Sequence, residues 1–181
     1  MRLFLFAFLG VIVGAGPAMA DQTDARLDAL FEQLRTGEAA DAETLAAEID
    51  AIWTDAQSDT VDLLYERALM AIDAGRVDLA GALVDHAIGL SPNFAQAYAL
   101  RGAVRLRTED ETGAITDFSH AIELEPRHFE ARIALAEIML AGGDKRGAYT
   151  MLQKALEWNP HDDHARSRAR KLRDSLDGQE I

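Results

Sequence analysis

The sequence predicts an all-α fold: a right-handed α-α superhelix of three 34-residue repeats with further helices at both ends. After the first twenty residues the chain contains only three prolines, Pro92, Pro126 and Pro160, and each lies 34 residues from the next. A fixed period of about 20 to 50 residues is typical of stacked-repeat architectures. Between the prolines, small and apolar residues recur at helical spacing. These observations predict helix pairs that stack side by side.

Residues 1–20 have the pattern of an export signal. Met1-Arg2 gives a positive start, residues 3–13 are almost wholly apolar, and Ala18-Met19-Ala20 is a small-x-small cleavage site. The apolar run is shorter than the roughly 20 residues that span a bilayer, although an uncleaved anchor is the alternative interpretation. We expect cleavage after Ala20, a periplasmic location and no stable membrane anchor, and the absence of cysteine leaves no site for a lipid.

The composition argues against several classes of partner. The chain carries 31 acidic and 18 basic residues, a net charge of −13. Such a chain repels nucleic acid and anionic lipid head groups. Because the chain has no cysteine, disulfides cannot stabilise it outside the cytoplasm. Packing of an apolar core must do so instead.

Residues 21–60 are predicted to form a helix pair before the repeats. The apolar residues of the first helix fall on one face, before Gly37, and those of the second fall on another. The two faces are Leu27, Leu30, Phe31 and Leu34, and Leu45, Ile49, Ile52 and Trp53. We expect this pair to pack on the first repeat, either as a separate element or as a degenerate fourth repeat.

Each repeat has a second helix that ends before its proline, because the residue preceding proline is pushed out of the α region. Small residues at i and i+7 let neighbouring helices approach, and a larger residue at i+4 fills the space between them. These columns are Ala80, Val84 and Ala87; Ala114, Phe118 and Ala121; and Ala148, Leu152 and Ala155. The first helix ends at Gly75 or Gly143, whereas Glu109 in the same column predicts a turn that is less tight or differently built.

Residues 61–94, 95–128 and 129–162 resemble tetratricopeptide repeats. The second repeat matches the family pattern best, and it departs from it at Arg105, where an aromatic residue is usual, and at Glu109. Its matching residues are Tyr98, Gly102, Ala114, Phe118, Ala121 and Pro126. The whole chain also resembles small exported repeat proteins of alphaproteobacteria. The resemblance implies a scaffold for protein–protein interaction.

Residues 163–181 are predicted to form a capping helix and tail. One face of the helix is apolar, with its basic residues mostly elsewhere, as suits a helix that covers the last hydrophobic surface of an array. The apolar face is Ala165, Ala169, Leu172 and Leu176.

No motif in the sequence indicates catalysis. The chain has no G-x-S-x-G, no H-E-x-x-H and no glycine-rich phosphate loop. His86 and His120 share a column one repeat apart, too far to bind one metal ion, and His161 and His164 flank an expected helix cap. We therefore expect no enzyme, no catalytic residue, no cofactor and no metal, with an enzyme or enzyme subunit as the least favoured alternative.

The family resemblance implies a concave groove lined by the first helix of each repeat. Its columns are mostly apolar, and an exposed apolar strip usually marks a binding surface. They contain Tyr65, Leu69, Ile72, Ala99, Ala103, Leu106, Ile133, Glu137 and Leu140. The Lys, Arg and Asn side chains with which this family grips a peptide carboxylate are missing, and Asp62, Glu66 and Glu130 lie nearby instead. We predict a partner protein or peptide with an apolar segment and basic flanks that meet the acidic rim.

Two alternatives compete with this groove. The N-terminal helices could cover the strip, or a second copy of the chain could do so, since repeat arrays expose apolar faces at their ends. In the second case the protein would be a self-associating structural component of the cell envelope, and a homo-oligomer stays open.

Overall fold

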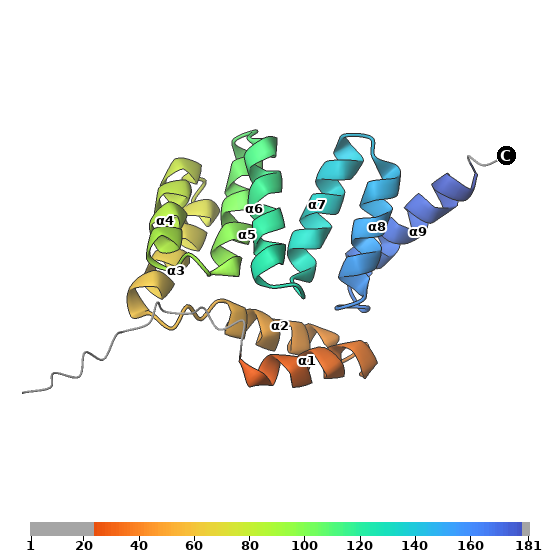
Figure 1. Ribbon diagram of the computed structural model, residues 1–181, viewed down its shortest axis with the longest axis horizontal. Helices are drawn as coiled ribbons and strands as arrows, with labels where there is room; N and C mark the ends of the chain where they lie inside the picture. Colours follow the sequence, from red (N-terminus) through yellow and green to blue (C-terminus); the bar gives the residue numbers. More distant parts are fainter. Residues whose placement is uncertain (1–23, 179–181) are drawn as a thin grey trace, which may run out of the picture.

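A computed structural model of the chain describes residues 24–178, in which all regular structure is α-helical (Figure 1). The proposed export signal and its cleavage site lie outside the described residues. The helices are α1 (Ala25–Thr36), α2 (Ala42–Trp53), α3 (Asp59–Asp73), α4 (Val77–Leu90), α5 (Ala95–Arg107), α6 (Glu111–Leu124), α7 (Phe129–Ala141), α8 (Lys145–Leu156) and α9 (Asp163–Asp177).

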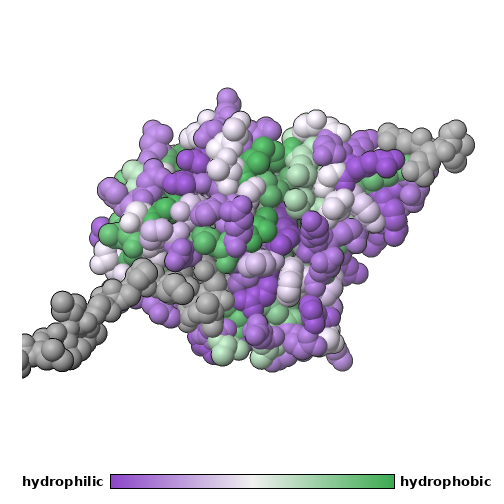
Figure 2. All heavy atoms as spheres, viewed as in Figure 1, coloured by the Kyte–Doolittle hydropathy of each residue, from purple (hydrophilic) through white to green (hydrophobic). Residues whose placement is uncertain are grey.

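Helices α3 to α8 stand side by side as three antiparallel pairs, which confirms the predicted all-α fold (Figure 1). The nine column residues of α4, α6 and α8 are at most 4% exposed, so they form the seams between helices. Each of these helices ends two or more residues before its proline. Apolar side chains also reach the surface where α6 and α7 meet, on a face that is otherwise mostly polar (Figure 2).

The second repeat packs most tightly between α5 and α6. A Cβ atom added at Gly102 would lie 3.0 Å from the ring of Phe118, so only glycine fits without a shift. Arg105, one of the departures from the family pattern, is part of an ion-pair network around the buried carboxylate of Asp117. Asp117 is 1% exposed and binds Arg101 Nη2 at 2.7 Å and Arg105 Nη1 at 2.8 Å.

The turns between the two helices of each repeat share one backbone conformation. Gly75 and Gly143 have φ values of 70° and 85°, and Glu109 has a φ of 63°. In each turn the next amide donates to a carbonyl five residues earlier, as Asp110 N does to Arg105 O at 2.9 Å. The expectation of a different turn at Glu109 is therefore wrong. The second repeat keeps the turn and places a non-glycine residue in the left-handed region.

The N-terminal pair packs on the second and third repeats where these two meet, so the expected docking on the first repeat is wrong. Helices α1 and α2 cross beneath the row, below the lower ends of α5, α6 and α7 (Figure 1). An aromatic cluster joins them to the array: the Phe31 ring lies 5.7 Å from Trp53 and 5.6 Å from Trp158, and Trp53 lies 5.7 Å from Phe129. Burying four large rings together outweighs what the smaller residues of the first repeat offer.

Polar contacts fix the same junction. Arg127, in the loop before α7, donates to Asp28 of α1 at 2.7 Å and lies over the Phe31 ring. Trp53 Nε1 donates to the buried carboxylate of Glu125 at 3.3 Å. Residues about a hundred positions apart are thus held together at this end of the array.

This placement leaves the outer side of α3 uncovered. Ala97 and Val104 of α5, which pack against the preceding repeat, are at most 4% exposed. The residues 34 positions earlier, Leu63 and Met70, are 47% and 63% exposed because no helix pair packs there. The same columns end at Leu172, which is buried between α9 and the third repeat.

Candidate concave binding site

A recess of about 330 Å³ opens on the inner side of α3, α5 and α7. Its wall is mainly apolar, and its polar residues come from one end, where α5 and α7 begin. The lining residues are Tyr65, Gln96, Ala99, Leu100, Ala103, Leu106, Phe118, Glu130, Ala131 and Ala134. Alanines at several positions of the wall keep the recess open, because larger side chains would fill it.

The predicted groove residues fall into two groups. Tyr65, Ala103 and Leu106 line the recess, and Leu69 on α3 is 40% exposed. Ile72 packs instead against the small core cluster formed by α3, α4 and α5. The structure therefore brings the residues of the first two repeats together around open space.

The groove residues of the third repeat are engaged within the chain. Ile133 packs on the N-terminal aromatic cluster, and Leu140 packs on the cluster under α9. Glu137 Oε1 lies 3.1 Å from His164 Nε2 and forms an ion pair with Arg168 Nε, also at 3.1 Å. The N-terminal pair and α9 thus occupy this end, and the open part of the strip is shorter than the sequence columns indicate.

The polar end of the recess was predicted from the sequence only in part: the predicted groove residues include Tyr65 but not Gln96. Gln96 Nε2 donates to Asp50 Oδ1 of α2 at 2.7 Å, so the crossing helix reaches the recess. Gln96 also acts on the pKa of both Tyr65 and Glu130, lowering it against the effect of desolvation. Asp62, Gln96 and Glu130 are 34 residues apart, and this polar column was the available signal.

The charges at this end perturb one another. Restricted hydration raises the pKa of Glu130 to about 7, and the negative charges of Asp50 and Asp162 add to the shift, although the side chain still reaches solvent. Desolvation also raises the pKa of Asp50, against the hydrogen bond from Gln96. The recess therefore combines apolar walls with a negative end.

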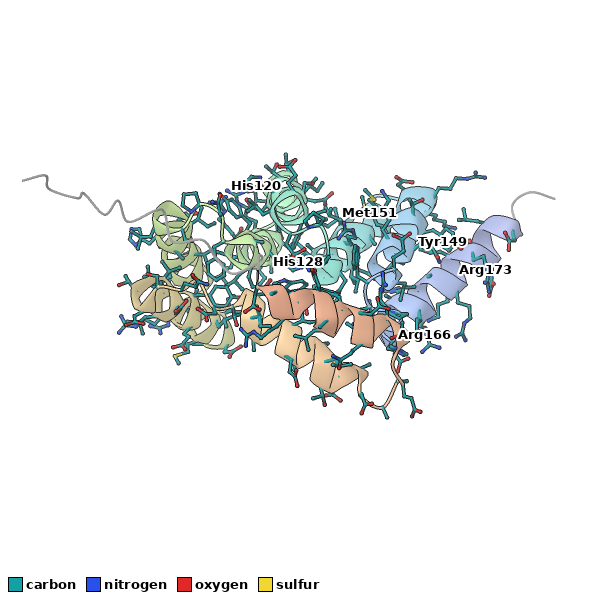
Figure 3. All side chains as sticks on the ribbon, turned by 60° about the horizontal axis from the view of Figure 1, so that its bottom comes forward. His120, His128, Tyr149, Met151, Arg166 and Arg173 are labelled. Atoms are coloured by element: carbon teal, nitrogen blue, oxygen red, sulfur yellow. The ribbon has the colours of Figure 1, made fainter. Side chains whose placement is uncertain are left out.

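The histidines do not gather at this site. His120 pairs with Glu123 at 3.0 Å on α6, and His86 is exposed on α4. His128 is buried where the row of repeats meets the N-terminal pair (Figure 3). In residues 24–178 no group of three or more His, Cys, Asp or Glu side chains could hold a metal ion.

A larger recess, of about 640 Å³, lies between α1 and α2. Its polar lining includes Arg26, Glu48 and Asp55, and none of the predicted groove residues reaches it. It is formed by one helix pair only, so it does not combine side chains from successive repeats as the concave recess does. Within the described part of the chain, no helix is long and apolar enough to cross a membrane.

Sequence comparison finds the repeat family. Residues 105–172 match a family model described as tetratricopeptide repeat. A TPR repeat-containing protein of Rhizobium etli is 38% identical over 80 residues, which are 44% of this chain and 39% of that protein. The chain thus spans well under half of the length of this curated relative.

Solved structures share the fold. The first TPR domain of Spaghetti (RPAP3), bound to an HSP90 peptide, covers 66% of this chain and 94% of its own, with 19% identity and a TM-score of 0.61. The type III secretion chaperone SycD of Yersinia enterocolitica, with a peptide of the translocator YopD, gives 19% identity, coverage of 66% and 96%, and a TM-score of 0.61. The Sgt2 TPR domain of Aspergillus fumigatus has 17% identity, coverage of 68% and 83%, and a TM-score of 0.62. None of these matches is to an enzyme family. Together with the 34-residue columns and paired helices, they show a tetratricopeptide repeat match over residues 105–172 within a chain that shares the fold of the solved TPR domains.

Proposed function

We propose that this protein is an exported periplasmic scaffold that binds a segment of a partner protein in its concave recess. The observation that carries the proposal is the open, largely apolar recess formed by α3, α5 and α7. Peptides bound to similar folds, as in the Spaghetti and SycD structures, support a binding role for this kind of array. The residues that line the recess act by binding the partner segment rather than by catalysing a reaction.

The lining chemistry favours an apolar segment with basic flanks. No Lys or Arg side chain lines the recess, so a C-terminal carboxylate would find no cation there. Leu106 and the alanines of the wall offer apolar surface, while Glu130 and Asp50 place negative charge at one end. Apolar contacts supply affinity and the charges set orientation and specificity.

The test is photo-crosslinking from Leu106 in the native cell envelope. A photoreactive residue at Leu106 should capture a discrete partner chain, and Leu69→Asp with Leu106→Asp should abolish capture from a reporter placed at Ala99. Both leucines are about 40% exposed, so we expect each change to cost only about 1 kcal/mol of stability. The matched control is Leu79→Asp with Leu90→Asp on α4, since these leucines are 40% and 57% exposed outside the recess.

The control should keep capture while showing similar helicity and a similar melting temperature. If the groove variant unfolds, Ala103→Glu at an exposed position of the same wall replaces it. Capture that survives a folded groove variant, or that is lost equally in the α4 control, contradicts the groove assignment.

The second candidate is self-association through the uncovered side of α3. Leu63 and Met70 are exposed in columns that a neighbouring helix covers in the other repeats, so the array ends in an unpaired apolar face. A second copy stacked there would give a structural assembly protein of the envelope. Light scattering should then show a dimer that Met70→Glu dissociates, and a photoreactive residue at Leu63 should capture a second copy of the chain. A monomer at high concentration would rule this candidate out.

A further inference from the structure

The end of the recess next to α2 has a shortage of hydrogen-bond donors. Asp50 of α2, Gln96 of α5 and Glu130 of α7 converge there, together with the ring of Tyr65 from α3. Neither Asp50 nor Glu130 forms an ion pair with any described residue. Helices α2, α5 and α7 thus bring hydrogen-bond acceptors to one end of the recess, and no described cationic side chain pairs with Asp50 or Glu130.

Gln96 provides an independent sign that a ligand belongs here. The side chain is only 7% exposed, and its Nε2 is used by Asp50 at 2.7 Å. Its Oε1 is buried and has no hydrogen-bond donor among the described residues. A buried acceptor without a donor costs about 1–3 kcal/mol, which a ligand that donates to it would recover. The Gln96 side chain also lines the recess.

The arrangement fits an alkylammonium group better than a metal ion. The described residues hold no cluster of His, Cys, Asp and Glu side chains of the kind that binds a metal. An ammonium group has three donors and no acceptor, which matches an amide oxygen and two carboxylates. The apolar wall at Ala99, Ala103 and Leu106 would pack against the methylene groups behind such a head.

We propose that this end of the recess binds the ammonium group of a lysine side chain in the partner segment. The proposal rests on the proposed function and adds the residue type that the partner presents. It places the basic flank of the partner next to α2, and its apolar part along α5.

Binding should depend on pH because the charges around Glu130 are coupled. The groups that face it are Asp50 from α2, Tyr65 from α3, Gln96 from α5 and Asp162 at the start of α9. Since the pKa of Glu130 is raised to about 7, the ionised fraction falls from about 0.9 at pH 8.0 to about 0.24 at pH 6.5. A cation that requires the ionised form would bind up to about fourfold more weakly at pH 6.5.

The test uses n-butylammonium, an analogue of the lysine side chain, with n-butanol as its neutral counterpart. NMR spectra of the full mature chain report on the side-chain amide of Gln96 and on the methyl groups of Ala99 and Ala103. We expect saturable shifts with butylammonium below about 100 mM, weaker at pH 6.5 than at pH 8.0, and none at Gln96 with butanol. Glycinamide, which has an ammonium group without the alkyl stem, distinguishes a chain N-terminus from a lysine.

The variant Glu130→Gln should lose saturation, and Glu123→Gln, the same charge change on α6 outside the recess, should keep it. Equal shifts with butanol, no saturation in the wild type, or unchanged binding in Glu130→Gln would overturn the proposal. Stronger binding of glycinamide would overturn the lysine assignment in favour of an N-terminus. If butylammonium does not bind as expected while crosslinking from Leu106 still captures a partner, the proposed partner-binding groove is retained and only the lysine site is rejected.

Discussion

The buried ring of His128 should make the folded protein less stable as the pH falls. Replacing His128 should remove most of this loss of stability. His128 is 1% exposed, and its Nδ1 accepts a hydrogen bond at 3.4 Å from the backbone N–H of Ala131. The ring lies 4.8 Å from Trp53, and Nε2 has no partner among the described residues. Burial lowers the pKa of His128 to about 3, and the positive charge of Arg132 lowers it further.

The sign of the effect follows from the two protonation equilibria. Unfolded, the ring has a pKa of about 6.5, so between pH 6.5 and pH 3 only the unfolded chain binds the proton. The stability linked to His128 is therefore complete above pH 6.5 and is lost as the pH falls. At pH 5.0 the loss is about 2 kcal/mol, a value set by the unfolded pKa and nearly the same for any folded pKa below about 4.

Urea unfolding at pH 7.0 and pH 5.0 measures this loss. His128→Asn keeps a side-chain oxygen that can accept from the Ala131 amide. The variant should be less stable than the wild type at pH 7.0 because the packing of the ring on Trp53 is lost. Its stability should nevertheless fall by about 2 kcal/mol less than that of the wild type between the two pH values. Other titrating groups, including Glu130, cancel in this comparison.

His86→Asn is the control, since it removes a histidine and keeps His128. It should retain the wild-type loss between pH 7.0 and pH 5.0. Equal losses in the wild type and in His128→Asn would refute the reasoning, because the ring would then accept a proton in the folded protein.

Three further tests of the repeat frame use urea unfolding. Glu109→Gly should stabilise the protein by about 0.5–1 kcal/mol, because it relieves a left-handed residue at φ 63° at some cost in chain entropy. Gly75→Ala or Gly143→Ala should destabilise the protein by about 1 kcal/mol. A Glu109→Gly variant that is less stable than the wild type would contradict this account. Asp117→Ala should lower the free energy of unfolding by about 2–4 kcal/mol, because it leaves Arg101 and Arg105 without their buried carboxylate. A loss below about 1 kcal/mol would show that this ion-pair network does not contribute to stability.

The sequence predicts the array well because its information is local and repeated. A small residue that recurs every 34 positions, as at Ala80 and Ala114, has one main use, which is a close approach between helices. The proline column marks each helix end for an equally local reason. Helix pairs and the seams between them therefore follow from the spacing of residues along the chain.

The docking of the N-terminal pair could not be predicted because it depends on contacts between distant residues. Trp53 is the last residue of α2 and Trp158 lies in the turn after α8, and no spacing relates them. The same cause explains the shortened groove, since Ile133 is exposed in an isolated repeat frame and covered once α1 and α2 cross beneath it. At Glu109 the propensity of the residue pointed to another turn, and the surrounding hydrogen bonds prevailed.

The crossing of α1 and α2 beneath the row also sets the order in which the array comes apart. Linear repeat arrays exchange contacts only with neighbours and fray from both ends. Here the bond between Arg127 and Asp28 closes a loop of 99 residues that ends just before the third repeat, while α3 keeps an open flank. Amide protons of α7 should therefore exchange last and those of α3 first. The recess lies between these two extremes, with one rigid wall and one that can yield to an incoming segment.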